Sequence, residues 1–191
     1  MSLLEIQLEA RNLLQLRPVF LHCKTTGAAE LSEVVEIAIL DSAGSPLCDE
    51  LVKPKRHIRE LGSDEHGLTD DMVNFAPKFS EILPEIEELL GGKMVCVYDK
   101  ESELLALKNS YQNNHNRWVL DDASFFSLMD LFSRYRNERD HRSGILRSYS
   151  LVEASCKLGI DIEVIAFRRA REDAWLMRAM LLAIAGWKVY Y

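Results

Sequence analysis

Residues 18–27 of the chain read Pro18-Val19-Phe20-Leu21-His22-Cys23-Lys24-Thr25-Thr26-Gly27. An apolar run that follows a proline and ends in Thr-Thr-Gly is typical of a short buried β-strand closed by a turn. In such a turn the glycine allows a tight bend, and the threonines can cap it without any ligand. The run therefore predicts a buried strand whose end carries polar and charged side chains.

The hydrophobic pattern elsewhere alternates between strands and helices. Apolar runs predict further strands at residues 34–40, 47–52 and 94–98, with a hairpin-length turn at residues 41–46, and a fifth strand at Val119-Leu120. Apolar residues at three- and four-residue steps predict helices, which lie at residues 1–16, 79–90, from 104 onward, 125–132, 151–158 and 170–185. Three adjacent strands followed by alternating helices and strands predict an α/β fold with a mixed five-stranded sheet between helices.

The length of 191 residues favours a single domain, because no repeat and no Gly/Ser/Pro-rich linker divides the chain. Residues 1–16 are expected to form a helix that starts with the capping-box pattern Ser2 to Glu5 and packs on a domain formed by residues 17–191. No apolar run is long enough to span a membrane, and the N-terminal residues show no signal-peptide pattern. The four cysteines lie far apart without a CxxC motif, which predicts reduced, buried thiols in a cytoplasmic protein.

The formal net charge of -7 argues against a dedicated nucleic-acid coat protein, because phosphate binding relies on clustered positive charge. Arginines nevertheless gather late in the chain, at residues 134–147 and 168–171. They form either a solvated face paired with acids such as Glu138, Asp140 and Glu172, or a phosphate-binding face. Because charge runs are weak signals, the solvated face is the favoured interpretation.

Five short stretches follow one another along the chain: HCKTTG at 22–27, HGLT at 66–69, PKF at 77–79, YDKESE at 98–103 and RRAREDA at 168–174. In this order they resemble the D-x-E-T-T-G, H-G-[IL]-T, P-x-F, [HY]-N-x-x-F-D and H-R-A-x-x-D-A signatures of the DEDDh 3'-5' exonucleases, relatives of the epsilon proofreading subunit of bacterial DNA polymerase III and of RNase T. The resemblance implies a ribonuclease H-like, three-layer α/β/α fold.

The same alignment shows that most of the family's catalytic residues are replaced. Such enzymes resemble two-metal nucleases, in which four carboxylates hold two divalent ions and a histidine acts as general base. The family positions are occupied here by His22, Lys24, Glu103, Arg168 and Asp173, of which only Asp173 is unchanged. A shift of one residue would place Ser102 at the central position and leave still fewer carboxylates.

The charges at these positions predict that no metal cofactor binds. Glu103 and Asp173 contribute two negative charges, which Lys24 and Arg168 already neutralise. A lysine ammonium about 4 Å from a divalent ion is repelled by about 8 kcal/mol at an effective dielectric constant near 20. Mg²⁺ also prefers oxygen ligands, so His22 is a poor replacement for a carboxylate. A single transition-metal site formed by His22, Glu103 and Asp173 is less favoured because Lys24 lies in the way.

The remaining residues of the resemblance each have two interpretations. Lys24 either neutralises Asp173 or Glu103 in a structural ion pair, which is favoured, or joins Arg168 in holding a phosphate. In the family the Thr-Thr-Gly turn lies against the terminal nucleotide, so the residues predicted to contact nucleic acid are Thr25, Thr26, Gly27, Lys24, Arg168 and Arg169. His66, which precedes a helix, is interpreted as a capping residue. Phe125, Met129 and Phe132 are interpreted as core residues.

Together these features predict a catalytically inactive exonuclease-like protein that binds nucleic-acid ends or a nucleic-acid-processing partner. One alternative is an active metal-dependent 3'-5' exonuclease, in which Asp173, Glu103 and either Asp99 or Glu101 gather one metal ion. Another is a protein-interaction scaffold that binds no nucleic acid, because a fold does not by itself decide function. The aromatic residues at 187–191 leave a homodimer or another protein partner open.

Overall fold

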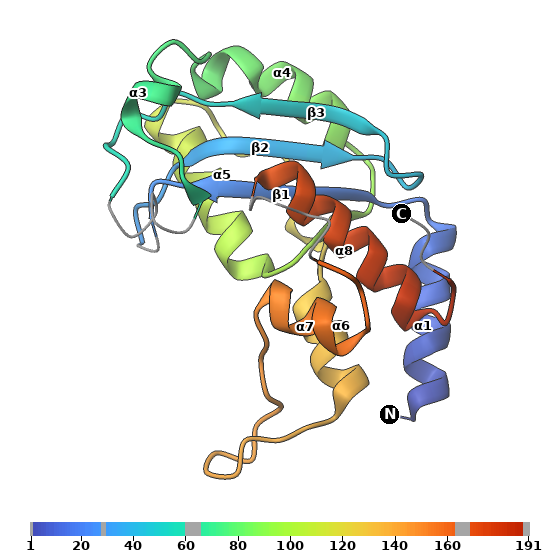
Figure 1. Ribbon diagram of the computed structural model, residues 1–191. Helices are drawn as coiled ribbons and strands as arrows, with labels where there is room; N and C mark the ends of the chain where they lie inside the picture. Colours follow the sequence, from blue (N-terminus) through green and yellow to red (C-terminus); the bar gives the residue numbers. More distant parts are fainter. Residues whose placement is uncertain (1, 28–29, 60–65, 163–168, 189–191) are drawn as a thin grey trace.

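The computed structural model describes residues 2–27, 30–59, 66–162 and 169–188. In this part of the chain five strands form one sheet in the order β3-β2-β1-β4-β5 (Figure 1). The strands are β1 (Val19–Thr25), β2 (Val34–Leu40), β3 (Pro46–Leu51), β4 (Val95–Val97) and β5 (Phe125–Ser127). β1 and β3 both run antiparallel to β2, whereas β4 runs parallel to β1 and β5 runs parallel to β4. The sheet is therefore mixed, as predicted.

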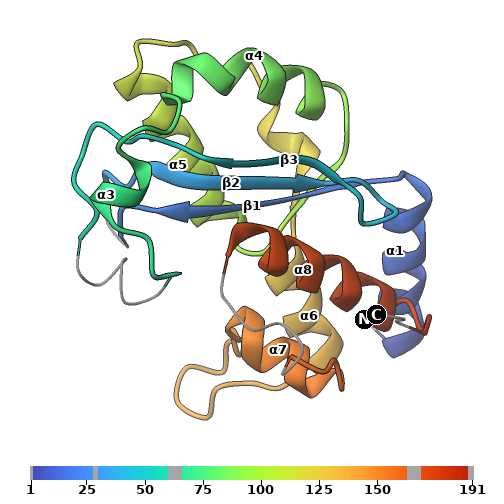
Figure 2. The same ribbon diagram turned by 45° about the horizontal axis from the view of Figure 1, so that its top comes forward.

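Helices cover both faces of the sheet (Figures 1 and 2). The described helices are α1 (Leu3–Gln15), α3 (Asp70–Val73), α4 (Phe79–Leu90), α5 (Lys100–Asn113), α6 (Leu128–Arg136), α7 (Leu151–Lys157) and α8 (Ala170–Ile184). α4 and α5 lie on one face, and α1, α6, α7 and α8 lie on the other. This three-layer α/β/α arrangement confirms the predicted fold class.

The alternation of side chains along β1 supplies both halves of the core. Val19 and Leu21 pack in the cluster that α4 and α5 share, whereas Phe20 packs in the cluster that contains α8. Successive side chains of a strand point to opposite faces, so an apolar run without polar interruptions is what a sheet covered on both sides requires. All seven residues of β2 are buried for the same reason.

The first helix begins where the sequence predicts. The Ser2 hydroxyl accepts a hydrogen bond from the Glu5 backbone N–H at 3.3 Å, and Glu5 accepts one from the Ser2 N–H at 2.6 Å, which is the expected capping box. Its buried face, formed by Ile6, Ala10 and Leu14, packs in the same cluster as α8. None of the helices in the described ranges is long and apolar enough to cross a membrane.

Two predicted elements near residue 120 are wrong. No strand forms at residues 119–120: Val119 is 62% exposed, and Asp121 caps a short 3₁₀ turn through a hydrogen bond from the Ala123 N–H. The fifth strand lies at Phe125–Ser127 instead, where Phe125 pairs with Val95. The helix predicted from residue 125 consequently begins only at Leu128. Phe125 and Phe132 are nevertheless buried and Met129 packs against the core, as expected.

Two further differences have local causes. α5 begins at Lys100 rather than at residue 104, because the Asp99 carboxylate accepts hydrogen bonds from the N–H groups of Glu101 and Ser102. Cys156 is exposed, so the expectation of four buried thiols holds only for Cys23, Cys48 and Cys96. The helix that carries Cys156 packs with its other face, on which Ala154 and Ser155 are buried.

Candidate functional site

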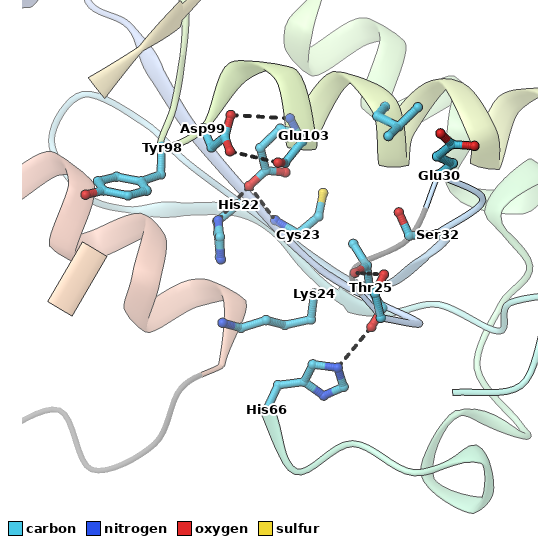
Figure 3. Close-up of a pocket in the computed structure, with 13 residues that line it drawn as sticks. His22, Cys23, Lys24, Thr25, Glu30, Ser32, His66, Tyr98, Asp99 and Glu103 are labelled. Atoms are coloured by element: carbon cyan, nitrogen blue, oxygen red, sulfur yellow. Dashed lines mark hydrogen bonds and ion pairs between the residues drawn. The ribbon is translucent and has the colours of Figure 1, made fainter. Parts of the chain in front are cut away.

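A cleft of about 520 Å³ opens beside the end of β1, between that strand and the first turn of α5 (Figure 3). His22, Lys24 and Thr25 line it from β1, Tyr98 and Asp99 line it from the segment that joins β4 to α5, and Glu103 lines it from α5. Figure 3 shows the ends of the His22 and Lys24 side chains beside the ribbon of α8. The two alternate positions of a β-strand share one face, which explains why both side chains lie there.

Two carboxylates, those of Asp99 and Glu36, fix the starts of α5 and α8. Asp99 caps α5 and so places Glu103 one turn into the helix, where the Glu103 N–H donates to the Asp99 carbonyl at 3.0 Å. Glu36, on the all-buried strand β2, accepts hydrogen bonds from the Ala170 N–H at 2.9 Å and from Arg169 Nε at 2.7 Å. These contacts fix the start of α8, which carries Asp173.

His22 lies between two acidic residues, Glu103 of the cleft lining and Asp173 of α8. Its Nδ1 is 2.6 Å from Glu103 Oε1, and its Nε2 is 3.3 Å from Asp173 Oδ2. Burial opposes the charged imidazolium, but the charge of Glu103 and the contacts with both carboxylates outweigh burial and raise the pKa of His22 to about 9. At neutral pH the ring is therefore a cation that contacts two anions.

Lys24 forms the second ion pair of this cluster. Its ammonium donates a hydrogen bond to Asp173 Oδ2, and the two side chains are only 7% and 10% exposed. Burial opposes ionisation of Asp173, but contacts with His22 and Lys24 prevail and lower its pKa to about 2. Two cations, His22 and Lys24, thus face two anions, Glu103 and Asp173, in a region largely shielded from water.

Comparison with known proteins places the chain among nucleases. No protein-family model matches it. It is 30% identical over 172 residues to the uncharacterized exonuclease CP81 of Escherichia phage 186, an alignment that covers 87% of each protein. The chain belongs to the DEDDh-type exonuclease family.

Solved structures of exonucleases have the same fold. Exonuclease X, solved in complex with 5' overhanging duplex DNA, superposes with a TM-score of 0.61 at 18% identity, over 89% of this chain and 93% of that one. A 3'-exonuclease solved in a study of 3'-end recognition of histone mRNA stem-loop superposes with a TM-score of 0.68 at 12% identity, over 89% of this chain and 64% of that one. The mixed sheet with flanking helices is thus the ribonuclease H-like fold of these exonucleases.

The structure brings together four of the five family positions. His22, Lys24, Glu103 and Asp173 contact one another as described, and Arg168 lies outside the described residues. The choice of Glu103 over Ser102 agrees with this geometry, because the Ser102 hydroxyl donates to Asp99 Oδ2 at 2.8 Å instead. Lys24 pairs with Asp173, and Glu103 is contacted by His22, which distinguishes the two partners that the sequence left open for Lys24.

This donor set does not suit the two divalent ions of the family mechanism. Lys24 is hydrogen-bonded to Asp173 Oδ2 and His22 contacts both carboxylates, so a divalent ion would have to displace these two side chains. Among the described residues, no group of three or more His, Cys, Asp or Glu side chains is arranged to hold a metal ion. Glu103 Oε2 is one of three buried carboxylate oxygens that have no hydrogen-bond partner in the same part of the chain; the others belong to Glu33 and Glu172.

The Thr-Thr-Gly turn is held by backbone groups. Thr26 exchanges backbone hydrogen bonds with Glu33 and Arg59, and its hydroxyl accepts from the Glu33 N–H at 3.1 Å. Gly27 has a φ of 138°, a conformation that favours glycine. Thr25 and Gly27 line the cleft, whereas Thr26 is buried and is not among its lining residues; contact of the turn with nucleic acid stays a prediction.

His66 does not cap the helix that follows it, so that expectation is wrong. The N-cap of α3 is Thr69, and His66 instead lines the cleft. Its Nδ1 accepts from the Leu68 N–H at 3.1 Å, so Nε2 carries the proton and donates to the Thr25 carbonyl at 3.0 Å. The ring therefore braces the end of β1.

The late arginines are largely paired with carboxylates. Arg134 bonds Glu9, Arg136 bonds Glu138, Arg147 bonds Glu153, Arg169 bonds Glu36, and Arg171 bonds Asp49. This supports the ion-paired interpretation of the cluster. Asp140 is an exception among the expected acids, because its carboxylate accepts from the N–H groups of Arg142 and Ser143. Binding of Arg169 to nucleic acid stays a prediction.

Sequence reasoning missed the role of Glu36. It lies at the middle of the apolar run that forms β2 and pairs across the sheet with Lys24 in the strand register. A charged residue inside an otherwise apolar strand is expected to have a buried partner. A charged residue in this apolar run could therefore have indicated that Glu36 has a buried partner, which the structure identifies as the start of α8.

Proposed function

We propose that this protein is a member of the exonuclease family that holds nucleic-acid ends in its cleft without hydrolysing them. The observation that carries the proposal is the position of His22, which contacts Glu103 and Asp173 at once. With Lys24 on Asp173, positive side chains stand where the family's chemistry requires bound cations. The carboxylates are thereby engaged by the chain itself.

The loss of hydrolysis follows from charge. Two-metal cleavage needs ions that activate water and stabilise the leaving oxygen. Here any divalent ion would have to displace an ammonium and an imidazolium from the same two carboxylates. A metal ion about 4 Å from the Lys24 ammonium would be repelled by about 8 kcal/mol at an effective dielectric constant near 20. Neither His22 nor Lys24 is free to act as the base that takes a proton from a water molecule.

The proposed binding of nucleic-acid ends rests on the Thr-Thr-Gly turn and on the open cleft beside it. The turn at residues 25–27 retains the Thr-Thr-Gly sequence of the family and borders an open cleft of about 520 Å³. Relatives of similar fold were solved with duplex DNA and in a study of mRNA 3'-end recognition. A member that has lost its metal ions but kept this turn is suited to hold a strand end rather than to shorten it.

A degradation assay tests the loss of hydrolysis. The protein is incubated with end-labelled single-stranded DNA and RNA in Mg²⁺ or Mn²⁺, with EDTA and an Asp173→Ala variant as controls. We expect the substrates to stay full length in every lane. Metal-dependent shortening that the Asp173→Ala variant lacks would overturn the proposal, and shortening that the variant retains would identify a contaminating nuclease.

Fluorescence anisotropy in EDTA tests the binding of ends. We expect a labelled linear oligonucleotide to bind, and we expect an unlabelled linear strand to compete better than a circular single strand of the same length. Equal competition would contradict recognition of ends. No binding of either nucleic acid at low salt would leave the fold as a scaffold for a protein partner.

One observation favours the alternative of an active enzyme with an atypical site. The unpartnered oxygen Glu103 Oε2 and the carboxylate of Asp99 border the same cleft, so a single metal ion there has two oxygens to bind. Asp99 is committed to the cap of α5, which argues against this arrangement. The degradation assay decides between the two functions.

A further inference from the structure

A strongly basic segment, Lys53-Pro54-Lys55-Arg56-His57-Ile58-Arg59, follows β3 and reaches the cleft. It contains four Lys or Arg residues and one His within a chain of net charge -7. The Arg59 N–H donates to the Thr26 carbonyl at 2.9 Å. The Arg59 side chain lies against Gly27, since a Cβ at that glycine would stand 3.5 Å from Arg59 Cβ and Cδ. The segment therefore adjoins the turn that borders the cleft.

Among the described residues, carboxylates pair with only part of the positive charge of this segment. Arg56 pairs with Glu33, and His57 contacts Asp70. The ammonium of Lys53 donates to the Asn74 carbonyl and side chain, and that of Lys55 donates to the Asn113 carbonyl. Within the described ranges, no carboxylate lies within 4.0 Å of the charged groups of Lys53, Lys55 or Arg59. Lys55 and Arg59 are exposed.

An exposed aromatic ring lies next to this charge. Phe75 is 96% exposed, and it directly follows Asn74, the residue that Lys53 contacts. Cations that follow a phosphate backbone, combined with an aromatic ring on which a base can stack, are the usual means of binding a single strand without sequence preference.

The centre of the cleft cannot supply this charge, because His22 and Lys24 are occupied by Glu103 and Asp173. We infer that residues 53–59, together with Phe75, hold the phosphodiester backbone and a base of a single-stranded nucleic acid whose end enters the cleft past Gly27. This inference rests on the proposed function and adds to it the path of the strand and its single-stranded nature.

The test is the affinity of a Lys55→Glu, Arg59→Glu double variant for single-stranded DNA and RNA, measured by anisotropy in EDTA. We expect the dissociation constant to rise about tenfold or more at low salt, and the slope of log affinity against log salt to fall by about 1.4, since each phosphate contact of a single strand contributes about 0.7. A matched control, Arg142→Glu with Lys188→Glu, reverses the same charge at exposed positions elsewhere on the surface. We expect the control to change the affinity by less than about threefold.

Equal weakening in both double variants would show only a net-charge effect and would overturn the inference, as would wild-type affinity in the Lys55→Glu, Arg59→Glu protein. The milder pair Lys55→Gln, Arg59→Gln, checked for folding by circular dichroism, guards against misfolding of the first variant. Phe75→Ala should weaken binding to single strands about threefold or more and leave duplex binding unchanged. Loss of both equally would contradict a stacking role.

Failure of the inference can be separated from failure of the proposed function. If the wild-type protein prefers linear over circular competitors but the variants bind equally well, only the inference fails. If the wild-type protein cleaves DNA in Mn²⁺, only the proposed function fails, because the binding measurement in EDTA still reports the role of residues 53–59. If the wild-type protein binds neither DNA nor RNA, both fail.

Discussion

The centre of the cleft and the turn beside it are held together by different kinds of contact. In the centre, the charged side chains of His22, Lys24, Glu103 and Asp173 contact one another, and the Cys23 N–H also donates to Glu103 Oε1 at 3.3 Å. In the turn, the backbone groups of Thr25 and Thr26 bond the backbone of Glu33 and Arg59 and the ring of His66. The centre holds four of the positions that the sequence aligns with the family's catalytic residues, whereas Thr25 and Gly27 of the turn line the cleft.

This difference explains which region keeps the family sequence. Backbone bonds in the turn depend on the path of the chain and need only a glycine that tolerates a φ of 138°. The centre instead has to balance buried charge, and it can do so either with bound cations or with basic side chains. A change of chemistry in the centre therefore need not disturb the turn.

Removing the shared anion of the centre should have the largest effect. Asp173→Ala takes away the carboxylate that both Lys24 and His22 contact, and an uncompensated buried charge costs about 3–5 kcal/mol. We expect urea denaturation to show a loss of unfolding free energy of that size. Asp173→Asn, which keeps the shape, should lose less. A loss below about 1 kcal/mol in Asp173→Ala would mean that water already screens the centre.

The pH dependence of stability should report the centre next. The pKa of His22 is raised from 6.5 to about 9, so its contribution is fully present below pH 6.5 and is lost as the pH rises through about 9. The change from 6.5 to about 9 corresponds to at most about 3 kcal/mol. The unfolding free energy of the wild-type protein, measured by denaturation, should fall as the pH rises over this interval. The unfolding free energy of a His22→Gln variant should stay nearly constant there. A parallel decline in both proteins would exclude His22 as the cause.

Restoring the family residues should convert the centre to metal binding. In a double variant, His22→Asp with Lys24→Glu, four carboxylates would face one another. Without metal this protein should melt below the wild type, because like charges repel. Mn²⁺ at about one hundred times its dissociation constant should then add about 2.7 kcal/mol, seen as a rise in melting temperature. The wild-type melting temperature should not respond to Mn²⁺, and an equal rise in both proteins would contradict the role given to His22 and Lys24.

The fold could be predicted from the sequence because its signals are redundant. The buried run of β2 matches the prediction residue for residue, and the capping box at Ser2 and Glu5 fixed the start of α1. The prediction failed at residues 119–127, where two apolar residues indicated a strand but a local cap at Asp121 bends the chain. Short apolar runs carry too little periodicity to locate a strand of three residues.

The site was predictable in its membership more than in its contacts. The family signatures predicted that His22, Lys24, Glu103 and Asp173 belong to one site, and the structure places them in contact. Which cation pairs with which anion depends on strand register and on the angle of α8, and neither is encoded in the local sequence. The contact of His22 with both carboxylates could not be predicted from the sequence either, since no rule of residue spacing predicts a side chain that bridges two others.

The smallest expected effect lies in the turn and marks the boundary between the two regions. Thr26→Val removes the hydroxyl that accepts from the Glu33 N–H, and a buried donor left without its partner costs about 1–3 kcal/mol. We expect a loss near the lower end, because the backbone bonds of Thr26 persist. Thr25→Val is the matched control, since within the described part of the chain the Thr25 hydroxyl makes only a long bond of 3.4 Å to the Gly27 carbonyl. The decisive measurement is the pH profile: if Thr26→Val keeps the wild-type decline between pH 6.5 and 9, the turn is independent of the charged centre, and if that decline is lost, the two regions are coupled and the contrast between them fails.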